Sequence, residues 1–154
     1  SWAVTRGPSA KPGTRRLAVR TEDHPLDYSA FEGRIPEKQY GAGTVMLWDR
    51  GTWRCLDKDP AAALEKGSLK FVLEGERMKG EWALVRMRTG ESRENWLLLK
   101  HRDEFAEEDD SLAERGLRRL LAGGELLVED AADNAGIGLL GVADLPGFVD
   151  LFVG

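Results

Sequence analysis

Short strand-like segments separated by turn residues dominate the sequence from Ser1 to Arg102, and they constrain the fold more than any other feature. Apolar and polar residues alternate in these segments, a pattern typical of half-buried strands. The segments are residues 16–21, 43–49, 53–56, 69–73, 81–88 and 95–101. Residues 49–52 and 89–92 have the composition of hairpin turns. Many short strands joined by glycine-rich turns favour a mainly β fold, either a small barrel or a sandwich.

One short helix is expected among these strands. Asp59 can cap its N-terminus, Pro60 suits its first position, and Gly67 can end it after the run of alanines and Leu64. The four tryptophans Trp48, Trp53, Trp82 and Trp96 follow the strand period. We expect them to lie in the core rather than to stack on bases.

A domain boundary is predicted after Asp103, with a barrel over residues 1–103 and a separate segment over residues 104–154. This segment starts with the acidic run 107–110, which resembles a linker, and continues with an amphipathic helix over residues 111–121. Residues 125–154 form an unassigned tail rich in glycine, alanine, leucine and aspartate. Within it, residues 126–128 or 148–153 could pair as strands and cover an open edge of the barrel, or could be loose.

Charge divides the chain at the same place. The whole chain of 154 residues carries a net charge of −5, yet residues 1–103 contain 19 Lys and Arg against 15 Asp and Glu. Residues 104–154 contain 3 against 12. A mildly basic body suits an anionic partner such as nucleic acid, although a solvated face has the same pattern. No apolar run has the length of a membrane span and no signal peptide is recognisable, which predicts a cytoplasmic protein. The single cysteine, Cys55, is expected to pack as a small apolar residue.

The densest chemical signal lies in residues 20–45. His24 stands at the end of an expected strand, Pro25 forces the chain out of it, and Tyr28 follows one turn later. A histidine and a tyrosine close to arginines can hold a phosphate and protonate it. Asp23 and His24 are neighbours that point to opposite faces of a strand, so a metal site built from this segment alone is disfavoured.

These residues resemble a known family. Residues 1–9, Ser-Trp-Ala-Val-Thr-Arg-Gly-Pro-Ser, are similar to the Ser-Trp-Ala-Val-Pro-Lys-Gly-Pro-Ser of the 3′-phosphoesterase domain of bacterial DNA ligase D. The similarity continues through residues 16–20, the segment around His24, and residues 48–53, 69–71, 80–86 and 95–100. It covers roughly two-thirds of the chain and is therefore far more specific than a single motif.

The resemblance implies a compact β-barrel with short flanking helices. It also implies an enzyme of non-homologous end joining that removes a 3′-phosphate or a terminal ribonucleotide from DNA. His24 and Tyr28 match catalytic residues of the family, and Arg16 and Arg6 match its phosphate-binding positions. Arg6 stands where the family usually has lysine, which changes the donor geometry. The implied partners are DNA 3′ ends at a primer–template and the ligase and polymerase domains of a parent protein.

The resemblance further implies Mn²⁺, held by two histidines and an aspartate from a His- and Arg-rich segment that would precede Ser1. The sequence begins without methionine and directly on an apolar strand. We therefore expect a truncated domain that lacks its metal ligands and is inactive alone. The alternative is a non-catalytic barrel that binds DNA ends or a partner. The second histidine, His101, is expected to be structural.

Overall fold

The structure is a computed structural model that describes residues 2–21, 33–35, 43–88, 94–115, 136–142 and 149–151. Of residues 33–35, 43–48, 50, 136–142 and 149–151, only the backbone is described. The elements are β1 (Trp2–Val4), β2 (Arg16–Arg20), β3 (Gly33–Ile35), β4 (Gly43–Cys55), α1 (Pro60–Lys66), β5 (Ser68–Gly75), β6 (Lys79–Arg86), β7 (Asn95–Lys100), β8 (Gly136–Val142) and β9 (Val149–Leu151).

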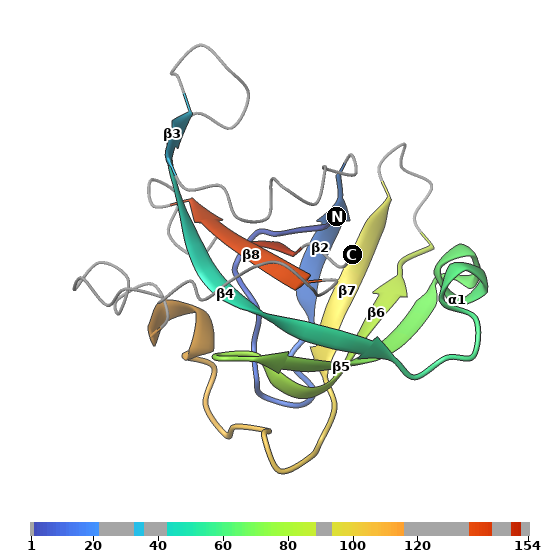
Figure 1. Ribbon diagram of the computed structural model, residues 1–154. Coiled ribbons are helices and arrows are strands. Elements are labelled where there is room, and N and C mark those ends of the chain that lie inside the picture. The colour runs from blue at the N-terminus through green and yellow to red at the C-terminus, as the bar shows by residue number, and fades with distance from the viewer. Residues whose placement is uncertain are drawn as a thin grey trace.

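The strands form one antiparallel sheet that curls around a core (Figure 1). Six strands follow each other across the curl in the order β4-β5-β6-β7-β2-β1. Beyond β1 come β9 and then β8, and β8 also pairs with β4, so the described pairings return to their starting strand. The expected mainly β, barrel-like fold with few short helices is confirmed. Closure of this kind leaves fewer open backbone edges than a flat sheet.

The core lies on the inner face of the curl and is built from alternate residues of each strand. The inner face of β5 carries Leu69, Phe71 and Leu73, each no more than 3% exposed. The register places Leu69 opposite Leu84 of β6, and Leu84 opposite Leu98 of β7. Opposite residues of neighbouring strands share a face, so these leucines form a continuous inner row. The other large, fully buried side chains are Trp82, Trp96, Met78 and Val4, which confirms the core role expected of two tryptophans.

Strand β4 corrects one prediction. The expected hairpin turn at residues 49–52 does not exist, because β4 runs unbroken from Gly43 to Cys55. The Asp49 carboxylate is buried and accepts hydrogen bonds from the N–H groups of Glu76, Arg77 and Met78, at 2.9, 3.1 and 2.7 Å. It therefore caps the neighbouring β5–β6 turn instead of forming a turn itself.

Gly51 also has a packing role rather than a turn role. Gly51 pairs with Gly75 of β5, and a Cβ atom at this position would collide with the carbonyl oxygen of Glu74. Glycine thus allows β4 and β5 to approach each other closely. Asp49 and Gly51, which indicated a turn in the sequence, instead serve contacts of β4 with β5 and the turn that follows it.

Helix α1 forms where the sequence predicts it. The Asp59 side chain accepts a hydrogen bond from the N–H of Ala62 at 3.1 Å, and Pro60 occupies the first turn. Gly67 ends the helix in the left-handed conformation, with φ 88°, and its N–H bonds to the carbonyls of Ala63 and Leu64. These are local signals that act over three or four residues, which explains why they could be read directly.

The tail contributes strands to the barrel. Residues 149–151, within the expected segment 148–153, pair with β1, placing Val149 opposite Val4 and Leu151 opposite Trp2. Strand β8 was not expected and pairs with β4. The alternative segment 126–128 lies outside the described residues, as does most of the predicted helix 111–121, of which residues 112–115 are helical. The domain boundary after Asp103 stays a prediction.

The Asp49 cap leads to a test of stability. Replacing Asp49 with alanine leaves three turn N–H groups without their acceptor, and we expect a loss of about 3 kcal/mol in the free energy of unfolding. The control is Asp59→Ala, which removes an exposed helix cap worth about 1 kcal/mol. Urea unfolding of both variants compares them. Equal losses would contradict the special role of Asp49.

Candidate functional site

Two of the four predicted site residues lie in the described part of the chain. Arg6 and Arg16 are described, whereas His24 and Tyr28 lie outside the described residues. The catalytic roles of the histidine and tyrosine therefore stay predictions.

Arg16 begins β2 and points to the inner side of the barrel. It lies opposite Leu98, at the end of the inner row formed by Leu69, Leu84 and Leu98. Its side chain is only 14% exposed. One nitrogen, Nη2, donates to Oδ2 of Asp110 at 2.5 Å. The Nε atom is buried and has no hydrogen-bond partner among the described residues.

Arg6 stands apart from Arg16 in the described contacts. It is exposed in the turn that follows β1, where the N–H of Gly7 bonds to the carbonyl of Val4 at 3.0 Å. No described contact joins Arg6 to Arg16. Arg16 is thus largely buried and paired with Asp110, while Arg6 is a solvent-facing cation in the turn after β1.

Two further arginines on the inner face were not singled out by the sequence analysis. Arg20 lies opposite Trp2, and Arg86 lies opposite Trp96. The guanidinium carbons stand over these rings at 5.9 and 5.6 Å, and the two tryptophans meet edge to face at 5.6 Å. The face of a tryptophan ring attracts a cation placed over it, which is a cation–π interaction. The signal was present in β2, where Arg16, Ala18 and Arg20 are two residues apart and share a face.

Glu94 completes this cluster. Its Oε2 accepts a hydrogen bond from Nη1 of Arg20 at 3.1 Å and one from Nε1 of Trp96 at 3.4 Å. The hydrogen bond from Arg20 lowers the pKa of Glu94, burial opposes it, and Trp96 and the charge of Arg86 lower it further. Glu94 therefore stays ionised and neutralises part of the positive charge of the inner face.

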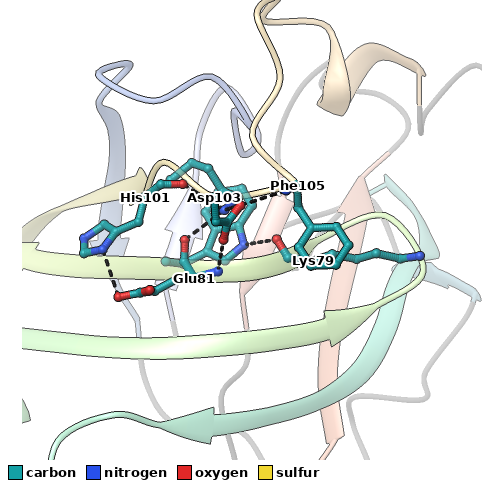
Figure 2. A network of polar contacts seen from close by, with 7 residues as sticks. Lys79, Glu81, His101, Asp103 and Phe105 are labelled. Atoms are coloured by element: carbon teal, nitrogen blue, oxygen red, sulfur yellow. Dashed lines mark hydrogen bonds and ion pairs between the residues drawn. The ribbon is translucent and has the colours of Figure 1, made fainter.

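A second polar cluster surrounds Lys100 at the end of β7. Figure 2 labels its members Glu81, His101, Asp103 and Phe105. The Lys100 side chain is completely buried. Its Nζ donates to the carbonyls of Glu81 and His101 at 3.1 and 2.9 Å, and to Oδ1 of Asp103 at 2.7 Å. Nζ also stands 5.5 Å from the centre of the Trp82 ring. An ammonium has three donors, and all three are used, so Lys100 is a structural residue.

Asp103 joins the other side of this cluster. It accepts hydrogen bonds from the N–H groups of Glu81 and Phe105 at 2.8 and 2.9 Å. Burial raises the pKa of Asp103, but the hydrogen bonds from Glu81, Lys100 and Phe105 together lower it below its ordinary value. His101, whose Nδ1 lies 3.1 Å from Oε1 of Glu81, belongs to the same group, in keeping with its expected structural role.

The parts of the chain that the structure describes contain no group of three or more His, Cys, Asp or Glu side chains placed to hold a metal ion. The described side chains therefore do not fit the manganese expected from the resemblance.

Cys55 packs beside the core, and its Sγ lies 3.6 Å from the carbonyl of Lys70.

The family model of the DNA ligase D 3′-phosphoesterase domain matches residues 1–86, more than half of the chain. The chain belongs to this family. The match includes β1, β2 and β4 to β6, and therefore Arg6, Arg16, Arg20 and Arg86.

Curated relatives carry the same assignment. The multifunctional non-homologous end joining protein LigD of Pseudomonas aeruginosa is 52% identical over 103 residues, which are 67% of this chain and 12% of that protein. The LigD proteins of Mycobacterium tuberculosis and Mycolicibacterium smegmatis are 38% and 34% identical, over 73% and 68% of this chain and 14% of each relative. The chain thus spans only about an eighth of the length of these relatives.

No helix in the described part of the chain is long and apolar enough to cross a membrane.

The Lys100 cluster generates a prediction on pH. Because the pKa of Asp103 is lowered by folding, its stabilisation is present above the unfolded Asp value of about 3.9 and is lost as pH falls through the folded value. Asp103→Asn should cost about 3 kcal/mol of unfolding free energy at pH 7.

The difference between the wild-type chain and this variant should shrink as the pH falls below about 4. Urea unfolding at a series of pH values measures it. Glu104→Gln, at an exposed neighbouring position, is the control for the charge change and should show little effect. A cost for Asp103→Asn that stays constant down to pH 3 would rule out the ionised carboxylate as its source.

Proposed function

We propose that this chain is part of a DNA 3′-end-processing phosphoesterase of non-homologous end joining, which removes a 3′-phosphate or a terminal ribonucleotide. The observation that carries the proposal is the family match over residues 1–86, together with 52% identity to the Pseudomonas aeruginosa relative. The half-buried Arg16 gives it further support, because it offers a charged donor on the inner side of the barrel. The partners are DNA 3′ ends and, in a longer protein, ligase and polymerase domains.

The proposed division of labour follows the chemistry of each side chain. Arg16 holds a phosphate oxygen by a charge-assisted hydrogen bond in surroundings that water reaches poorly. Arg6, exposed at the rim, adds a second positive charge. His24 protonates the leaving oxygen or stabilises the transferring phosphoryl group, and Tyr28 contacts the phosphate.

Manganese is part of the proposal only for a longer domain. The described side chains do not supply a ligand set. The resemblance assigns this role to a His- and Arg-rich segment on the N-terminal side of the matched motifs. When bound, such an ion would neutralise phosphate charge and activate a water molecule.

The first test is catalytic. It uses a primer–template with a 3′-phosphate, with and without Mn²⁺, and compares this chain with a version that includes any residues encoded before Ser1. We expect phosphate release by the longer version, reduced at least about 100-fold by His24→Ala. The chain has two histidines, so His101→Ala is a matched control that should retain activity. Undiminished turnover by His24→Ala would refute its role.

The second test concerns binding by Arg16. Arg16→Gln should weaken the binding of a fluorescent duplex with a 3′-phosphate by about tenfold, because a charged hydrogen bond is lost. Arg15→Gln removes the same charge from the exposed neighbour and is the control. Fluorescence anisotropy against a duplex with a 3′-hydroxyl isolates the contribution of the phosphate. Equal effects of the two substitutions would argue against a specific anion position at Arg16.

A non-catalytic barrel that binds DNA ends or a partner is the second candidate. The observation that favours it is that the described side chains include no set of metal ligands. It predicts binding of the 3′-phosphorylated duplex without any dependence on Mn²⁺, and no turnover by the longer version. Turnover by that version would exclude it.

A further inference from the structure

The segment that follows β7 is fixed to the barrel at several points along its length. We call residues 101–115 the strap. At its start, Asp103 is bound to the buried Lys100. In its middle, the N–H of Glu107 donates to the carbonyl of Ala10 at 2.8 Å. Near its end, Leu112 is 6% exposed and belongs to the hydrophobic core. A segment anchored in this way presents its side chains at defined places, unlike a loose linker.

The acidic residues of the strap have separate contacts. Glu107 forms an ion pair with Arg115. Asp109 accepts hydrogen bonds from the N–H and the hydroxyl of Ser111, at 3.2 and 2.8 Å, just before the helical residues 112–115. Asp110, in contrast to Glu107 and Asp109, has a described ion pair with an arginine on the inner face of the barrel, Arg16.

The carboxylate of Asp110 contacts the guanidinium of Arg16 through a single nitrogen. Oδ2 of Asp110 meets only Nη2, although a guanidinium can present two parallel N–H groups to one anion. The Nε of Arg16 stays buried without a partner among the described residues. The Asp110 side chain is 41% exposed, so it can turn away into solvent while the strap stays anchored. A phosphate with several oxygens could engage both Nη2 and Nε.

We propose that the carboxylate of Asp110 occupies the anion position of Arg16 in the free protein, so that a DNA phosphate must displace it. The strap is then an autoinhibitory element that lowers the affinity of the barrel for phosphorylated ends. This inference rests on the proposed role of Arg16 and adds a competitor within the same chain. A competitor tethered beside its site acts at high effective concentration, so even a single weak ion pair reduces apparent affinity.

The test measures binding of a fluorescent DNA duplex with a 3′-phosphate, and of the same duplex with a 3′-hydroxyl, by anisotropy. Asp110→Asn should strengthen binding of the phosphorylated duplex by about three- to tenfold, since an ion pair of modest strength no longer competes. Glu108→Gln makes the same change in net charge at an exposed position of the strap. It should raise the affinity for both duplexes only slightly and equally.

The outcomes separate this inference from the proposed function. A phosphate-specific gain with Asp110→Asn, abolished when Arg16→Lys is added, supports the inference, because lysine keeps the charge but not the paired donors. If Arg16→Gln weakens phosphate binding but Asp110→Asn behaves like Glu108→Gln, the inference alone fails. If neither the wild-type chain nor any variant distinguishes the two duplexes, the anion role of Arg16 and the inference fail together. Urea unfolding of each variant verifies that it is folded.

Discussion

The register of β2 between β1 and β7 is the constraint on which the charged inner face depends. Arg16 lies opposite Leu98, and Ala18 lies opposite Trp96. The buried Leu98 and Trp96 hold this register, because a shift by one residue would turn Leu17 inward and the arginines outward. Ala18 is completely buried between the two arginine positions, and its small side chain leaves room for the tryptophans beside it. Hydrophobic packing thus determines where the cations can act.

Buried polar residues connect this core to the segments that surround it. Asp49 caps the turn between β5 and β6, and Lys100 holds the start of the strap through Asp103. Burying a charge is unfavourable unless its hydrogen bonds are satisfied, and both residues meet that condition. Asp49 and Lys100 matter for stability mainly because removing one partner would leave the other buried without its hydrogen bonds. The anchored strap, and with it the position of Asp110, therefore depends on the buried contact between Lys100 and Asp103.

The sequence predicted those features that arise from local interactions. The caps of α1 and the alternation in β5 act over a few residues, and both were correct. The signal at residues 49–52 was also local but misleading, because Asp49 and Gly51 serve contacts with β5 and its turn, more than twenty residues away. Strand β8 and the ion pair of Arg16 with a residue 94 positions later depend on closure of the barrel, which no local pattern reveals. His24 and Tyr28 were proposed from their motif and from the family resemblance, and both lie outside the described residues.

The position of Asp110 also changes how the net charge of the chain bears on the binding of nucleic acid. In the sequence, the acidic run belongs to a tail that makes the net charge of the chain negative. A negative net charge argues against binding to nucleic acid. In the fold, Asp110 neutralises Arg16 locally, at a distance of 2.5 Å, while Glu107 pairs with Arg115. A phosphate that replaces a carboxylate exchanges one ion pair for another, so its net gain is the difference between the two. The difference favours the phosphate when it also accepts a hydrogen bond from the Nε of Arg16, which the carboxylate leaves unpaired. A DNA end would then bind Arg16 more tightly than the strap does.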